Sequence, residues 1–115
     1  MSIKRIENTP RMTKAVVHGD TVYLSGITAD DRSATVEVQC QQILDKIDAL
    51  LEKAGTNKSK LLSSQIWLTD ISTWARFNTV WDAWVDPENA PARATVEAPL
   101  AAPGLSIEIM VIAAL

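Results

Sequence analysis

The sequence predicts an α+β fold in which two helices cover one face of a mixed β-sheet. Residues 34–54 and 73–85 carry apolar side chains at spacings of three and four, the period of an amphipathic helix. Short apolar runs bounded by turn residues, which are typical of strands, precede, separate and follow these two segments. A chain of 115 residues is long enough for one domain, and two such helices can cover only one face of a sheet.

Three strands are predicted before the first helix. Residues 3–6 form a short strand that ends at Asn8-Thr9-Pro10. Residues 14–18 and 21–26 flank Gly19-Asp20, a pair suited to a type II′ turn. These two segments are therefore expected to form an antiparallel hairpin.

The first helix is predicted over residues 34–54. Ser33 or Thr35 is expected to cap its start, and Gly55 fits the position just past its end. Its apolar stripe consists of Val36, Cys40, Ile43, Ile47, Leu50, Leu51 and Ala54.

A buried strand over residues 60–69 precedes the second helix, because Ile66-Trp67-Leu68 is an apolar run between polar neighbours. Ser72 is expected to cap the helix over residues 73–85, and Asp86-Pro87 to end it. One face of this helix is marked by Trp74, Phe77, Trp81 and Trp84.

Residues 92–98 and 106–114 are the last predicted strands, joined by a turn over residues 99–104. In the final strand Ile107 and Ile109 share one face, while Met110 and Ile112 share the other with Glu108. Both faces of this strand are thus expected to be buried. Because the helices cover one face, a homo-oligomer is expected to cover the other.

Charge and composition argue against several classes of partner. A net charge of −3 opposes binding to nucleic acid or to a membrane surface. The sequence has no apolar run long enough to span a membrane, and its N-terminus lacks the features of a secretory signal. A single cysteine, Cys40, excludes an internal disulfide and fits the reducing cytoplasm. A cytoplasmic protein is expected.

No metal or cofactor is expected. One histidine and one cysteine cannot form a zinc cluster, and no glycine-rich phosphate-binding motif is present. His18 is expected to be a solvated turn residue, and Cys40 to pack in the core. The four tryptophans have Asp82 and Asp86 beside them rather than basic residues, which favours packing over base stacking.

Arg93 and Glu108, each on a predicted strand, are the strongest candidates for chemistry, and two interpretations are open. In the first interpretation, the two side chains form a structural ion pair. Alternatively, the guanidinium grips a ligand carboxylate with its planar fork, while the glutamate, at the rim of the same pocket, holds or deprotonates a water.

Five segments together resemble the Rid family of reactive intermediate deaminases, also called the YjgF family. The C-terminal pair is residues 91–98, PARATVEA, and residues 107–114, IEIMVIAA. Leu24-Ser25-Gly26 resembles the family's first serine-glycine turn. Residues 43–55, ending in LLEKAG, resemble its first helix, and residues 77–84, FNTVWDAW, resemble its second. The resemblance extends over nearly the whole chain, so residues 1–115 are expected to be a single Rid-like domain.

The resemblance implies a chorismate-mutase-like fold and a homotrimer with a barrel-like core and ligand clefts between subunits. By position, Arg93 would bind a substrate carboxylate and Glu108 would orient the attacking water. The resemblance also implies that the cleft is lined by Ser25, Gly26, Asn78, Thr95 and Met12. The implied reaction is hydrolysis of a small 2-imino acid, or its enamine tautomer, to a 2-keto acid and ammonia, without metal or organic cofactor.

Three departures from the family pattern indicate a less-characterised subgroup. Met12 stands nearest to the position of an N-terminal aromatic residue, residues 27–33 form a shorter segment, and Thr95 replaces a frequent cysteine. Met12 favours the alternative of a non-catalytic trimeric module that binds small carboxylates or keto acids. A role on RNA is a third hypothesis, which the acidic composition disfavours.

Overall fold

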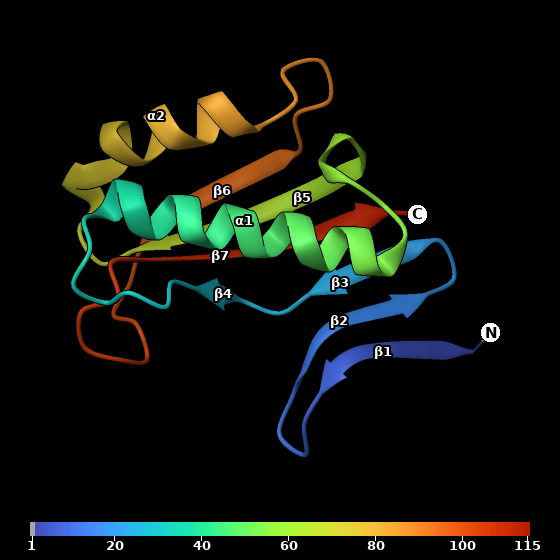
Figure 1. Cartoon of the computed structure of the whole chain (residues 1–115). Helices are drawn as coiled ribbons and strands as arrows, with labels where there is room; N and C mark the ends of the chain where they lie inside the picture. Colours follow the sequence, from blue (N-terminus) through green and yellow to red (C-terminus); the bar gives the residue numbers. More distant parts are fainter. Residues whose placement is uncertain (1) are drawn as a thin grey trace.

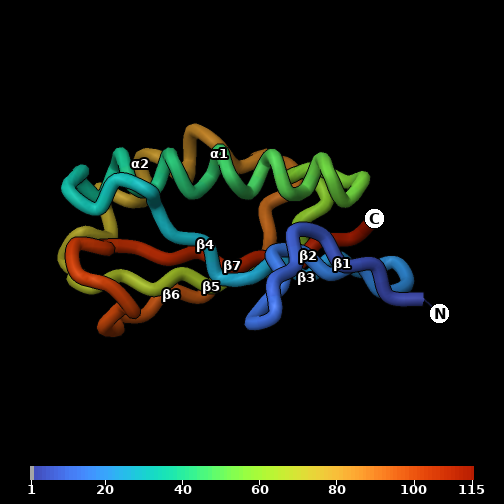
Figure 2. Tube along the Cα trace, turned by 60° about the horizontal axis from the view of Figure 1, so that its bottom comes forward, coloured from blue at the N-terminus to red at the C-terminus, as the bar shows by residue number. Residues whose placement is uncertain are grey.

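The computed structural model describes residues 2–115 as a two-layer α+β domain, with one sheet and two helices on the same face of it (Figures 1 and 2). The helices are α1 (Val36–Ala54) and α2 (Trp74–Trp84). The strands are β1 (Ile3–Asn8), β2 (Thr13–His18), β3 (Thr21–Leu24), β4 (Ile27–Thr28), β5 (Leu61–Leu68), β6 (Ala92–Glu97) and β7 (Ile107–Ala114). The predicted fold class is confirmed.

The sheet is mixed. Its order is β1-β2-β3-β7-β5-β6, with β4 pairing with β7. β5 and β6 are parallel, and every other pair is antiparallel. Parallel neighbours need a crossover connection, which α2 supplies (Figure 1). β6 is the last strand at one edge of the sheet, and it lies beneath α2 (Figure 1).

The predicted hairpin forms between β2 and β3, with Val17 opposite Val22. Gly19 adopts a φ of 61°, the left-handed conformation that glycine tolerates, and Asp20 does not. A positive φ at the first turn residue alone is the mark of a type II′ turn.

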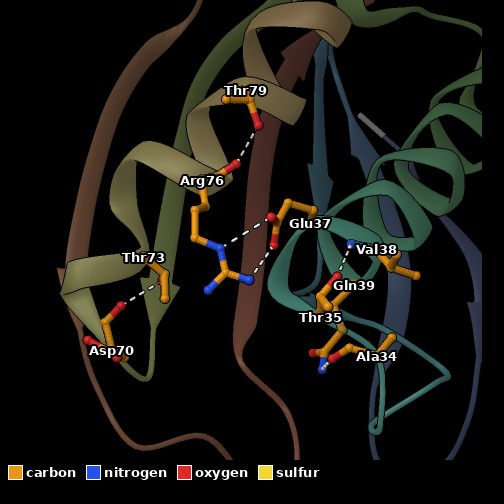
Figure 3. Close-up of polar contacts among 9 residues, drawn as sticks. All are labelled: Ala34, Thr35, Glu37, Val38, Gln39, Asp70, Thr73, Arg76 and Thr79. Carbon is orange, nitrogen blue, oxygen red and sulfur yellow. Dashed lines mark hydrogen bonds and ion pairs between the residues drawn. The ribbon is translucent and has the colours of Figure 1, made fainter.

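Thr35, rather than Ser33, caps α1, and its hydroxyl accepts a hydrogen bond from the Val38 amide at 3.3 Å (Figure 3). The helix therefore begins two residues later than predicted. Ser33 instead donates its hydroxyl to Asp31. Gly55 ends the helix with a φ of 89°, as expected.

The start of α2 differs from the prediction. Ser72 does not cap it, because Ser72 lies inside a 3-10 turn, Ile71–Thr73, whose cap is the side chain of Asp70. Phe77, Trp81 and Trp84 of the predicted face are buried. Trp74 has the right spacing but is 49% exposed, since no element packs over this first residue of the helix.

Two polar contacts join the helices at opposite ends. Arg76 pairs with Glu37 at 2.7 Å near their N-terminal ends (Figure 3), and the Trp84 indole donates to Asp48 at 3.0 Å. Between these contacts, the buried faces of both helices pack on the sheet.

Strand β4 was not predicted, because two residues are too few to show a period. Ile27 pairs with Ile109 and Thr28 with Glu108, which extends the sheet along β7. Within residues 2–115, neither helix is long and apolar enough to cross a membrane.

Only one face of the sheet is covered within the chain. On β7, Ile107, Ile109, Val111 and Ala113 are buried under the helices. The alternate residues, Glu108, Met110, Ile112 and Ala114, are only partly buried. The expectation that both faces of this strand are buried is therefore not met by the single chain, whose two helices lie on one side. We call the uncovered side the open face.

Candidate functional site

The Arg93 side chain lies on the helix-facing side of β6. The register aligns Arg93 with Ser64 of β5 and, through it, with Val111 of β7, and both of these side chains are buried on the helix side. Its Nη1 donates a hydrogen bond of 2.8 Å to Oδ1 of Asn78 on α2. The structure thus brings together two of the predicted site residues from different elements.

Two aromatic rings hold the Arg93 guanidinium in place. Its central carbon lies 5.1 Å from the centroid of Phe77 and 5.4 Å from that of Trp81. Guanidinium groups are attracted to aromatic faces at this separation. Both rings were predicted only to pack, with no role at a site. The sequence feature that could have indicated this contact is the position of the two rings, one residue before Asn78 and three residues after it.

Arg93 keeps its positive charge uncompensated within the chain. Its side-chain partner, Asn78, is a neutral amide, and among residues 2–115 no carboxylate lies within 4.0 Å of the guanidinium. A guanidinium has five N–H donors. Most of these donors remain available for an anion.

Glu108 lies on the opposite side of the sheet. In the register, Glu108 is aligned with Trp67 of β5, and Trp67 is aligned with Val96 of β6. Val96 points away from the helices, because it alternates with the helix-facing residues of β6. The Glu108 carboxylate packs against Gly26, where a Cβ atom would collide with Oε2. Within one chain, Arg93 and Glu108 therefore form no ion pair and do not share a pocket.

The other predicted site residues are divided between the side of the sheet that carries Arg93 and the neighbourhood of Glu108. Thr95, two residues after Arg93, is partly buried on the same helix-facing side. Ser25 adjoins Gly26, its amide donates to the Lys14 carbonyl at 2.8 Å, and its hydroxyl is buried without a partner. Met12 lies exposed in the β1–β2 connection, two residues before Lys14.

A hollow of about 340 Å³ lies over β5, β6 and β7, and Arg93 is among its lining residues. Its lining comes mainly from the open face and is predominantly apolar, with Met110, Ile112 and Ala94 next to Ser63 and Gln65. A hollow of this size falls in the range of small-molecule sites.

His18 and Cys40 have the roles expected of them. His18 is exposed beside the hairpin turn. Cys40 is buried in the core, and this burial raises the pKa of its thiol to about 12. Among residues 2–115 no group of three or more histidine, cysteine, aspartate or glutamate side chains is placed to hold a metal ion.

Comparisons with known proteins agree with the predicted resemblance. Residues 2–115 match the family model described as Endoribonuclease L-PSP. The RutC family protein YoaB of Escherichia coli K12 is 40% identical over 114 residues, covering 99% of each chain.

Two solved structures extend the agreement to three dimensions. NMB1025 of Neisseria meningitidis, a member of the YjgF protein family, superposes with a TM-score of 0.96 at 38% identity, over 99% of this chain and 95% of that one. YyfA of Yersinia pestis, from the conserved Rid protein family, superposes with a TM-score of 0.92 at 28% identity, over 99% and 100%. The chain belongs to the Endoribonuclease L-PSP family, whose members also carry the names YjgF, RutC and Rid.

Proposed function

We propose that the protein hydrolyses small 2-imino acids, or their enamine tautomers, to 2-keto acids and ammonia. The observation that carries this proposal is the uncompensated guanidinium of Arg93, held by a neutral amide and two aromatic rings. Such a group can bind the carboxylate of an imino acid through two parallel hydrogen bonds. Membership of the Endoribonuclease L-PSP family supports this proposal, because the resemblance to the family implies that Arg93 binds a substrate carboxylate.

We further propose that the active form is a homotrimer in which one subunit supplies Arg93 and a neighbour supplies Glu108. The two side chains lie on opposite sides of the sheet, so one chain alone cannot bring both to the same ligand. The open face offers a surface for self-association, because Tyr23 and Val96 are exposed on it and Met110 is partly exposed.

In the proposed reaction, Arg93 binds the substrate carboxylate and the Glu108 carboxylate accepts a proton from a water molecule. The water oxygen forms a bond to C2 of the protonated imine, whose electron pair moves to nitrogen. Glu108 then returns its proton to the amine of the resulting carbinolamine. The C–N bond breaks as the hydroxyl proton passes to a solvent water molecule, and 2-keto acid and ammonia leave.

The test is a coupled assay in which an amino-acid oxidase generates a 2-imino acid and its decay is followed with and without the protein. The protein is expected to accelerate decay, and Arg93→Met to reduce kcat/KM at least about tenfold, the scale of one charge-assisted bond. Glu108→Gln is expected to lose turnover while still binding a 2-keto acid. Arg76→Met, which removes an arginine paired with Glu37 at the surface, is the matched control and is expected to retain activity.

A failure to accelerate decay across several imines would remove the deaminase proposal. Light-scattering mass measurement tests the assembly separately, since a monomeric protein would leave Arg93 and Glu108 apart.

A second candidate is a non-catalytic module that binds small carboxylates at the same guanidinium. Met12, exposed where the family pattern places an aromatic residue, favours this candidate. Stabilisation of the protein by 2-keto acids without turnover of any imine would select it. The family model's description names an endoribonuclease, but a net charge of −3 does not favour RNA.

A further inference from the structure

A second cavity, of about 380 Å³, is lined by residues of α1, of the β1–β2 hairpin and of the segment around strand β4. It shares no lining residue with the hollow beside Arg93. Its apolar lining comes from Ile27 of β4 and from Ala49 and Leu50 of α1. Its volume is that of a typical small-molecule site.

Two ion pairs connect the walls of this cavity. Lys53 of α1 binds Glu7 of β1 at 2.8 Å, and Lys46 of α1 binds Asp30 at 2.7 Å. Lys46 also donates to the carbonyl of Thr28 at 2.8 Å, which ties the helix to β4. These contacts hold the hairpin, the helix and the segment around β4 in place on the sides of the cavity.

Glu7 reaches Lys53 through an unusual backbone conformation. Its φ is 53°, and it is the one residue other than glycine with a positive φ in residues 2–115. The β1–β2 ladder pairs Ile6 with Ala15 and Asn8 with Thr13, so it is interrupted where Glu7 lies across from Lys14. Such a conformation costs free energy, and strain of this kind concentrates at functional sites.

One cation at the cavity is not paired with a carboxylate of residues 2–115. Lys14 also lines the cavity, yet among residues 2–115 it has no carboxylate within 4.0 Å. The strand register places Lys14 across from Glu7, whose pKa is lowered mainly by its hydrogen bond to Lys53. Three lysines and two carboxylates line the cavity, so its net charge is +1.

We propose that this cavity binds a small organic monoanion, with its carboxylate on Lys14 and its apolar body over Ile27 and Leu50. A single negative charge matches the single excess positive charge, and an apolar body matches the lining. The site is independent of the proposed deaminase reaction, because it contains neither Arg93 nor Glu108.

The test is a titration of the full-length, isotopically labelled protein with hexanoate, followed by amide NMR shifts. Shifts are expected at residues 14, 27, 50 and 53. Lys14→Met is expected to weaken this binding about tenfold, the loss of one charge-assisted bond. The matched control is Lys4→Met on exposed β1 outside the cavity, and it is expected to leave binding unchanged.

Ligand controls separate charge from apolar contact. Hexylammonium has the same chain with the opposite charge, and acetate has the charge without the chain, so both are expected to bind more weakly. Arg93→Met is expected to leave the shifts at residues 14 and 50 intact, which separates this site from the proposed deaminase site. Equal binding of hexylammonium, an unaffected Lys14→Met variant, or shifts confined to the surroundings of Arg93 would overturn the proposal.

Discussion

Arg93 on the edge strand β6 donates a 2.8 Å hydrogen bond to Asn78 on α2, so the direction of the guanidinium is set by two separate elements. Phe77 and Trp81, on the same helix, place aromatic rings within 5.4 Å of the guanidinium carbon. Because Asn78 is neutral, this arrangement orients the guanidinium without cancelling its charge. The neutral partner is the feature that leaves Arg93 able to bind an anion.

Asn78→Asp should reduce anion binding while preserving the geometry of Arg93. The new carboxylate is nearly the same shape as the amide and would pair with the guanidinium, so a 2-keto acid is expected to bind at least about tenfold more weakly. Calorimetric titration measures the change. Asn57→Asp is the matched control, because Asn57 caps the short 3-10 turn Lys58–Lys60 and aspartate is an equally good cap. Unchanged affinity in Asn78→Asp would contradict the role given to Arg93.

Gly26→Ala should impair turnover more than binding. A Cβ atom at this position collides with the Glu108 carboxylate, which is the mobile end of its side chain and is expected to move aside. We expect kcat to fall about tenfold with little change in KM, because displacing the proposed general base would slow the chemical step. Steady-state kinetics on a 2-imino acid checks this. A normal kcat would show that the resting position of Glu108 is unimportant.

Gln39→Ala should destabilise the fold strongly. Gln39 is fully buried on α1, where its amide nitrogen donates to the carbonyls of Ala34 and Gly104 and its oxygen accepts from the Ser106 amide. Removing the side chain leaves these buried groups unpaired, at a cost of about 3 kcal/mol in the free energy of unfolding. Urea denaturation measures this loss.

Gln41→Ala is the matched control for that experiment, because Gln41 is exposed and bonds only Asp45 one turn away. Its cost is expected to be about 0.5 kcal/mol or less. Similar losses in both variants would show that Gln39 does not hold the β6–β7 connection.

Cys40 should be inert to thiol reagents in the folded protein. Burial raises the pKa of its thiol to about 12, so the reactive thiolate is almost absent at neutral pH. Labelling with a disulfide reagent at pH 8 is expected to proceed only as fast as the protein opens. Labelling should become fast once urea unfolds the chain, since the thiol then regains its ordinary pKa and full access. Rapid labelling of the folded protein would contradict this assignment.

The predictions succeeded where the signal lies within a short stretch of neighbouring residues. The apolar stripe of α1, the II′ turn at Gly19 and the strand alternation of β7 each follow from neighbouring residues, so they could be found without the rest of the chain. The start of α2 was predicted wrongly, because a 3-10 turn capped by Asp70 precedes the helix and such a short turn has no clear sequence signature.

The sequence by itself determined the fold class, the two helices, the family resemblance and the residue types available for chemistry. Only the tertiary structure decided which of these residues meet. Strand alternation assigns Arg93 and Glu108 to faces of their own strands, but the register across β5 and β7 decides that those faces are opposite. Likewise, the contact of Arg93 with Asn78 and the cavity around Lys14 depend on how distant elements pack, which no local pattern encodes.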